Sequence, residues 1–301
     1  IAGILEHLEP AGVHSGDSTA VIPPFSINEE NLKEIKEKSK KLALGLNVKG
    51  LLNIQFAIKD EELFILEANP RASRTMPFVA KVTGNQIIKA GTLLMLGYSI
   101  DDVRNNTKYL SSSTNKVAIK KAIFPWSRFP AEDTMLGPEM KATGEVLGIG
   151  KKFGTALNKA YAAAGVEINN KGKGIFVTLS DDEKPNFIKT INKYLELGFT
   201  LYATEGTGKF LKTNGIESVI VGKADDSGQT SLTIIKDKLV SLVINTPTYA
   251  NELTDGWKIR RLSHETGVAV VSSVREADAF IQAFLNQNLV LEDMEVIQDV
   301  S

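Results

Sequence analysis

The sequence contains no cysteine, which excludes a disulfide framework and a zinc site built from thiolates. It also has no apolar run close to the roughly 20 residues that a membrane-spanning helix needs, so we expect no membrane span. Neither sign of charge is in excess: 35 Lys and Arg stand against 36 Asp and Glu, and we expect no nucleic-acid partner. No signal peptide is visible and Ile1 is not a natural start, so we expect a fragment of a cytoplasmic protein.

The composition is that of a globular protein, with 43% hydrophobic and 24% charged residues in a chain of 301. A chain of this length is expected to form about two domains. In the first, the apolar spacing over residues 28–46 predicts an amphipathic helix, and a second helix is expected over 84–97. Two apolar runs, 51–58 and 63–69, are separated by four polar residues and predict an antiparallel hairpin. Residues 105–115, rich in Asn, Ser and Thr, are expected to form a loop.

The pattern changes near Gly150. Residues 117–150 show no long period and indicate a connector packed on the first unit. Beyond Gly150, short apolar runs alternate with helical stretches, which predicts a parallel, Rossmann-like sheet covered by helices on both faces. The predicted strands are 175–179, 199–203, 218–221, 239–244 and 268–272.

One group of polar residues lies at the exit of the second hairpin strand. Side chains alternate along a strand, so Glu67 and Asn69 project the same way, and Gln55 can join them from the neighbouring strand. Their oxygens suit Mg²⁺ holding the oxygens of a triphosphate. Arg71 and Arg74 follow and can bind phosphoryl oxygens. From spacing alone, the alternative that these residues close a solvated surface strand and form ordinary ion pairs stays open.

Two longer motifs carry a resemblance to a known family. The strings EHLEPAGVHSGD at 6–17 and FILEANPRASRT at 64–75 resemble the second ATP-grasp domain of the large subunit of glutamine-dependent carbamoyl phosphate synthetases. The resemblance implies a ligase domain that uses ATP to phosphorylate carbamate, giving carbamoyl phosphate for pyrimidine or arginine synthesis. It also implies a separate glutaminase small subunit as partner.

The resemblance assigns roles to individual residues. Arg71 and Arg74 are expected to serve the transferred phosphoryl group and the carbamate. The metal ligands, for Mg²⁺ or Mn²⁺ with ATP, are expected to be Gln55, Glu67 and Asn69. The residues expected at the nucleotide are Gly12, Val13, His14, Ser15, Gln55 and Glu67.

The resemblance also divides the chain. It implies an α/β protein with part of an ATP-grasp α+β domain at 1–104, a connector at 105–150 and a Rossmann-like domain similar to methylglyoxal synthase at 151–301. Because the resemblance begins inside the ATP-grasp domain, we expect a split active site and a fragment that is inactive alone.

Two strand exits in the second domain carry hydroxyl residues, at 204–207 and 245–248, and Lys184 and Lys223 can supply positive charge. Phosphate groups bind at the carboxyl ends of parallel strands and at helix N-termini. Taken singly, such residues are more often turn formers and solvated lysines. Together they resemble the nucleotide-binding regulatory domain of the same family, with a uridine nucleotide as the expected effector, although Pro247 stands where some members have a hydroxyl residue. The implied effector contacts are Thr178, Lys184, Thr204, Thr207, Lys223, Asn245 and Thr246.

A second effector site, for ornithine in some family members, fits less well. Glu9 and Asp17 match its acidic positions, but Lys121 replaces a glutamate and Val270 replaces a tyrosine. An ammonium group in place of a carboxylate repels a cationic ligand, so we expect ornithine activation to be weak or absent.

Three other functions remain as alternatives. A different ATP-grasp ligase, such as a carboxylase component, would share the Glu and Asn metal ligands but lack the second domain. A sugar-phosphate lyase would need acid-base residues, and the second half offers only His264, near Arg260 and Arg261. The chain can also act alone as a nucleotide-binding regulatory module. Of the other histidines, His14 is assigned to nucleotide contact only and His7 to no function.

Overall fold

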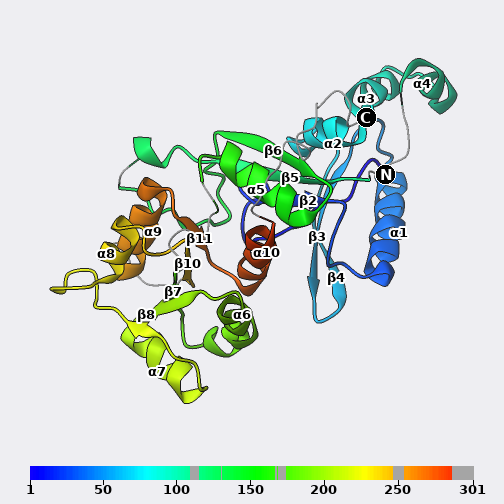
Figure 1. The fold of residues 1–301 in the computed structure, drawn as a ribbon. Coiled ribbons are helices and arrows are strands. Elements are labelled where there is room, and N and C mark those ends of the chain that lie inside the picture. The colour runs from blue at the N-terminus through cyan, green and yellow to red at the C-terminus, as the bar shows by residue number, and fades with distance from the viewer. Residues whose placement is uncertain (109–114, 130, 167, 169–173, 247–253, 287–301) are drawn as a thin grey trace.

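The fold places a four-stranded antiparallel sheet and a separate hairpin before a five-stranded parallel sheet (Figure 1). The computed structural model describes residues 1–108, 115–129, 131–166, 168, 174–246 and 254–286. Elements up to Gly150 are β1 (Glu6–His7), β2 (Ala20–Ile22), α1 (Glu29–Gly45), β3 (Asn53–Lys59), β4 (Glu62–Asn69), α2 (Thr75–Thr83), α3 (Ile87–Met95), α4 (Ile100–Asn106), β5 (Val117–Ile123), η1 (Trp126–Arg128) and β6 (Gly144–Gly150). Those that follow are α5 (Phe153–Ala163), β7 (Gly174–Thr178), α6 (Lys184–Glu196), β8 (Thr200–Ala203), α7 (Glu205–Thr213), β9 (Val219–Ile220), α8 (Ser231–Lys236), β10 (Leu242–Asn245), α9 (Asp255–Thr266), β11 (Ala269–Val271) and α10 (Val274–Leu285).

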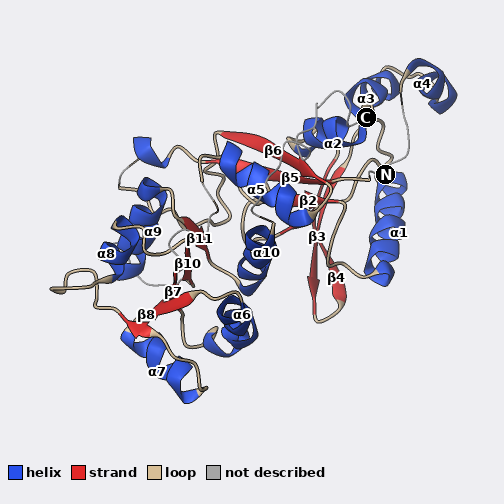
Figure 2. Cartoon of the chain, in the orientation of Figure 1, coloured by secondary structure: helices blue, strands red, loops and turns tan. Residues whose placement is uncertain are grey.

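The hairpin predicted from the two apolar runs is confirmed. Strands β3 and β4 pair antiparallel through the turn at 60–61, where Asp60 and Glu61 both adopt positive φ. The predicted amphipathic helix is α1, which begins after Asn28, whose side chain accepts from the N–H of Asn31. Figure 2 shows α1 running alongside the hairpin, and the Lys38 ammonium donates to the carbonyl of Leu63 in β4.

The segment expected to be a connector contains two strands of the first sheet. Strands β5 and β6 pair antiparallel with each other, and β5 pairs with β2, so the sheet order is β1-β2-β5-β6. The sequence showed no long period over 117–150 and did not predict these two strands, and the connector with its limits at 104 and 150 stays a prediction. The loop expected over 105–115 begins inside α4, and its residues 109–114 lie outside the described part.

The parallel, Rossmann-like second sheet is confirmed, with strand order β11-β10-β7-β8-β9. Each of its long strands faces two cores. In β7, Ile175 and Val177 join the core formed with α5, α6 and α10, while Phe176 points to the core formed with α8 and α9. Burial on both faces explains why these strands are continuous apolar runs in the sequence.

The first sheet also faces two cores. Val21 of β2 and Ile119 of β5 belong to the same core as the second domain, whereas their neighbours Ile22 and Ala118 pack with α2. Helix α5 packs on β5, β6 and α10, and Figure 1 shows both helices in the middle of the molecule. One hydrophobic core therefore runs from the first sheet into the second domain.

Charged side chains are buried where the two parts meet. Glu9, next to β1, accepts from the backbone N–H of Thr19 (2.6 Å) and from its hydroxyl (2.7 Å). The Lys121 ammonium lies 3.9 Å from a Glu9 oxygen and 4.8 Å from the centre of the Tyr161 ring. Burial raises the pKa of Glu9 to about 7, although Lys121 opposes this rise.

This raised pKa predicts how stability depends on pH. A carboxyl that holds its proton more tightly when folded stabilises the fold below its unfolded pKa of 4.5, and that contribution is lost as the pH rises through about 7. His7 and His264 have the opposite effect on stability, because burial lowers the pKa of each to about 4. The stability that these neutral histidines contribute is lost as the pH falls from 6.5 toward 4. The effect of Glu9 is therefore isolated by comparing wild type with Glu9→Gln.

Relative to wild type, Glu9→Gln is expected to gain up to about 3 kcal/mol in free energy of unfolding between pH 4.5 and pH 7.5. Urea unfolding at several pH values measures this difference. The exposed Glu217→Gln is the matched control and should follow the wild-type profile. Parallel profiles for wild type and Glu9→Gln would show that the Glu9 carboxyl is not protonated in the folded protein at pH 6.

Candidate functional site

The three side chains predicted to bind metal lie together at the open end of the β3–β4 hairpin. Gln55 pairs with Glu67 across the two strands, just before a register shift. The Gln55 amide donates to Glu67 Oε1 at 2.6 Å, and the Asn69 amide donates to the same oxygen at 2.9 Å. The same-face alternation expected for Glu67 and Asn69 and the cross-strand approach of Gln55 are both present.

The loop at 12–17 approaches this group from the first sheet. The Gln55 amide also donates to the Ser15 hydroxyl at 2.8 Å, so the loop and the hairpin share one hydrogen-bond network. The Lys120 ammonium of β5 donates to the carbonyls of Ser15 (3.0 Å) and Gly16 (3.2 Å). Asp17 is buried and accepts from the backbone of residues 141 and 142, so its role is to hold the loop.

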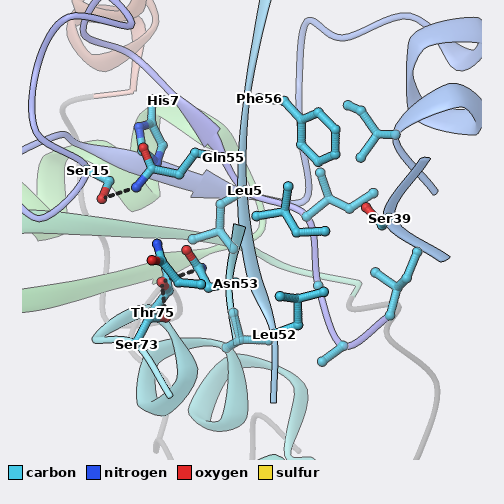
Figure 3. A pocket seen from close by; sticks show the side chains of 18 of the residues that line it. Leu5, His7, Ser15, Ser39, Leu52, Asn53, Gln55, Phe56, Ser73 and Thr75 are labelled. Atoms are coloured by element: carbon cyan, nitrogen blue, oxygen red, sulfur yellow. Dashed lines mark hydrogen bonds between the residues drawn. The ribbon is translucent and has the colours of Figure 1, made fainter. Parts of the chain in front are cut away.

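Ser15, Gln55, Glu67 and Asn69 line a cleft of about 1520 Å³. Figure 3 shows Gln55 directed toward Ser15 on one side of β3, whereas Phe56 lies on the other side of the strand. The expected contact residues Val13, His14, Ser15, Gln55, Glu67, Asn69, Arg71 and Arg74 all line the cleft, whereas Gly12 is not among the lining residues.

The two arginines lie beside the group without joining its hydrogen bonds. Arg71 donates to the neighbouring carbonyl of Ala72 at 3.0 Å, and Arg74 is the residue that precedes α2. Both arginines line the same cleft as Glu67 and Asn69. A guanidinium in this position can bind phosphoryl oxygens through paired N–H donors.

The sequence reasoning missed a second polar group in the cleft. The Asn53 amide donates to the Thr75 hydroxyl at 3.4 Å, and the Ser73 and Thr75 hydroxyls lie 2.8 Å apart (Figure 3). Asn53 is two residues before Gln55 and so shares its strand face, a signal that the alternation already contained. Ser73 and Thr75 lie in the motif at 64–75, whose spacing predicts no role for them.

The residues fit a hard divalent cation held jointly with a ligand. Among the described residues, no three His, Cys, Asp or Glu side chains gather as a metal cluster. One carboxylate, from Glu67, and two amides, from Gln55 and Asn69, supply oxygen ligands only. Such a set suits Mg²⁺, which keeps few protein ligands and takes the others from phosphate and water.

The histidines are not placed for proton transfer. His7 lies in the cleft wall, but burial and the nearby Lys120 lower its pKa to about 4, so it is neutral at pH 7. His264, on which a lyase would depend, is packed against Trp126 with ring centres 5.9 Å apart. Its pKa is also lowered to about 4, chiefly by burial. The His14 imidazole accepts from the N–H of Gly16 within its own loop.

A second group of predicted residues gathers at the carboxyl edge of the parallel sheet. Thr178 at the end of β7 pairs with Asn245 at the end of β10, which is where the strand order changes direction. Thr207 accepts from the N–H of Leu179 at 3.1 Å, and Thr246 accepts from that of Ser180 at 2.7 Å. The crevice at such a change of direction is where open parallel sheets bind ligands.

Two lysines lie near this edge of the sheet. The Lys184 ammonium lies 3.9 Å from the position that a Cβ on Gly206 would occupy, so it faces the first turn of α7. It also pairs with the exposed Asp181 at 2.5 Å. Lys223 follows β9 and contributes to lowering the pKa of Glu205 in that turn, although the Lys209 ammonium has the larger effect. Thr204 immediately precedes α7, and Pro247 lies outside the described residues.

Two of the residues compared with an ornithine site, Glu9 and Lys121, form the buried contact between the two parts. Lys121 occupies the space beside Glu9 and donates to the Thr19 hydroxyl at 3.2 Å. Val270 packs on the opposite side of the second sheet, with α8 and α9. Weak or absent ornithine binding stays a prediction, which this ammonium beside Glu9 supports.

Two family models match the chain. One, described as the carbamoyl-phosphate synthase L chain, ATP binding domain, matches residues 4–103, and the other, an MGS-like domain, matches residues 186–272. The first range contains the cleft residues Ser15, Gln55, Glu67 and Arg71. The second contains most of the strand-exit residues but not Thr178 or Lys184.

Curated relatives cover most of the chain. It is 39% identical over 296 residues to the "Carbamoyl phosphate synthase large chain, C-terminal section" of Aquifex aeolicus, covering 94% of this chain and 55% of the relative. It is 43% identical over 283 residues to the large chain of Archaeoglobus fulgidus, covering 94% and 26%. The chain therefore spans about half, or less, of these relatives.

Among solved structures, the biotin carboxylase subunit of pyruvate carboxylase matches with a TM-score of 0.36 and 15% identity, over 50% of this chain and 43% of that one. This likeness is too distant to support an argument. No described helix has the length and apolar character needed to cross a membrane.

Proposed function

The chain is a homologue of the C-terminal section of carbamoyl phosphate synthase large chains, an ATP-dependent ligase family, and on this basis we propose that its cleft takes part in phosphorylating carbamate with ATP. The observation that carries the proposal is the shared network of Ser15, Gln55, Glu67 and Asn69. It joins a loop to three oxygen-bearing side chains, beside two arginines, in one cleft.

Each side chain has a role in this reaction. A divalent cation, Mg²⁺ or Mn²⁺, would be held by Gln55, Glu67 and Asn69 and would neutralise charge on the phosphates of ATP. Arg71 and Arg74 bind the transferred phosphoryl group and orient the carbamate oxygen that attacks the γ-phosphorus. The bond to ADP breaks as the new bond forms, and fixed positive charge in the cleft stabilises the transition state.

The chain is proposed to work only as part of a larger protein. It spans 26% of the large chain of Archaeoglobus fulgidus, and phosphoryl transfer depends on enclosing the nucleotide between positioned groups. We infer that carbamate, a glutaminase small subunit and the product's use in pyrimidine or arginine synthesis belong to that complete enzyme. The chain alone is not expected to turn over ATP.

Glu67→Gln in the complete enzyme tests the cleft. The substitution keeps the shape but removes the negative charge that attracts the cation, so carbamate-dependent ATP turnover should fall at least about a hundredfold. Glu62→Gln, on the same strand but outside the cleft, is the matched control and should retain activity. Turnover near wild type with Glu67→Gln would remove this residue from the metal site.

The strand-exit group is proposed to bind a nucleotide effector, with a uridine nucleotide as the expected ligand. The position of Thr178 and Asn245 at the change in strand order supports this, as do the hydroxyls of Thr204, Thr207 and Thr246. The buried hydroxyls also hold the loops after β7, so they fix the shape of the crevice. Lys184 and Lys223 supply the charge that a phosphate needs.

Lys184→Ala tests this site through binding. Loss of one charge-assisted contact should weaken the affinity for uridine 5′-monophosphate by roughly ten- to a hundredfold, measured by calorimetry at fixed ionic strength. Lys189→Ala, an exposed lysine on the same helix α6, is the control and should bind like wild type. Equal affinities for wild type and Lys184→Ala would move the phosphate elsewhere in the domain.

A further inference from the structure

Arg260 of α9 connects the strand-exit group to the first part of the chain. Its Nε and Nη2 donate to the two carboxylate oxygens of Asp133, at 3.1 and 2.6 Å. Its Nη1 donates to the side-chain oxygen of Asn245 at 2.8 Å. The guanidinium is nearly buried, with 10% of the side chain exposed. One arginine thus binds a candidate effector residue and a residue of the first part of the chain at the same time.

Asp133 lies in a segment that is held to the nucleotide loop. Its carboxylate accepts from the N–H of Met135, and its carbonyl accepts from the Lys141 ammonium at 3.0 Å. The N–H of Lys141 then donates to the Asp17 carboxylate at 2.8 Å. The segment 133–141 is therefore fixed at one end by Arg260 and at the other by Asp17.

From Asp17 the contacts reach the candidate metal ligands. The N–H of Asp17 donates to the carbonyl of His14 at 2.9 Å, and the N–H of His14 donates to the carbonyl of Gly137 at 2.8 Å. The next residue, Ser15, accepts from Gln55, which donates to Glu67. Hydrogen bonds and short stretches of backbone thus lead from Asn245 to Glu67.

Two other arginine contacts between the parts do not begin at the strand-exit group. Arg261, next to Arg260, donates to the carbonyl of Phe129. Arg275 of α10 pairs with Glu6 and the Ser26 hydroxyl. Neither arginine contacts a residue of the strand-exit group in the described structure, so both serve to hold the parts together.

We propose that Arg260 couples occupancy of the strand-exit crevice to the position of the nucleotide loop. This inference rests on the proposed effector site. An anion held at Asn245 attracts the same guanidinium that Asp133 binds, so the anion and Asp133 compete for Arg260. When the anion binds, the fork on Asp133 weakens and the segment 133–141 loosens its hold on Asp17 and His14.

The geometry of arginine makes this competition discrete. A guanidinium binds a carboxylate best through two parallel N–H donors, and a rotation that directs them to another anion loses that pairing. In the structure Nε and Nη2 bind Asp133 while Nη1 binds Asn245. The proposed second arrangement turns the paired donors from Asp133 toward the anion. A ligand changes the balance by its differential affinity for the two arrangements, which is the requirement for coupling between sites.

Hydrogen exchange measured by mass spectrometry on the complete 301-residue chain tests the proposal. Saturating uridine 5′-monophosphate should speed exchange in residues 14–18 and 135–142 by about two- to thirtyfold. In Asp133→Asn, exchange in both segments should already be fast without ligand and should not change further. The affinity of this variant for the nucleotide should exceed that of wild type, because Arg260 is released.

Asp225→Asn is the matched control. Asp225 pairs with Lys258, which lies on α9 like Arg260, but this pair does not connect to the first part of the chain. Its exchange should match wild type. Unchanged exchange in residues 14–18 of ligand-free Asp133→Asn overturns the coupling role of Arg260, whether or not a ligand binds. The coupling role is also overturned if the nucleotide binds saturably to wild type but hydrogen exchange in residues 14–18 and 135–142 does not change. Absence of any binding heat contradicts the uridine effector instead, and the ligand-free comparison still decides the link.

Discussion

The arrangement of the molecule depends on a small antiparallel sheet whose two faces belong to different hydrophobic cores. Val21 and Ile119 face the core of the second domain, and Ile22 and Ala118 face α2. Because side chains alternate along a strand, a shift of one residue in the β2–β5 register would exchange the two sets. The packing of both cores therefore fixes the register, and the register fixes where the loop at 12–17 leaves the sheet.

Buried polar groups complete this junction and give it its function. The Glu9 carboxyl accepts from Thr19 and faces the Lys121 ammonium, so the polar groups at the centre of the contact have partners. On one side of the junction, the loop delivers Ser15 to the hairpin residues that are proposed to hold ATP and metal. On the other, Arg260 reaches the strand-exit crevice. The two proposed sites share one structural frame, so binding at one can influence the other.

Alternation and strand-end chemistry could be read from the sequence, whereas contacts between distant segments could not. The pairing of Gln55 with Glu67 could be predicted, because both hairpin strands have clear ends and are joined by a polar turn. Strands β1 and β2 have only two and three residues, too few to show a period, and the adjacent lysines Lys120 and Lys121 interrupt the apolar pattern of β5. The link between Arg260 and Asp133 joins residues 127 positions apart and leaves no local signal.

Scanning calorimetry of this chain tests the shared core most directly. If one core unites the two parts, unfolding should occur as a single transition whose calorimetric and van't Hoff enthalpies agree. Saturating uridine 5′-monophosphate should then raise the midpoint of that whole transition, because a ligand that binds only the folded state stabilises everything that unfolds with its site. Two separate transitions, with only one shifted by the nucleotide, would show that the second domain unfolds independently. That result would contradict a single hydrophobic core shared by the two parts.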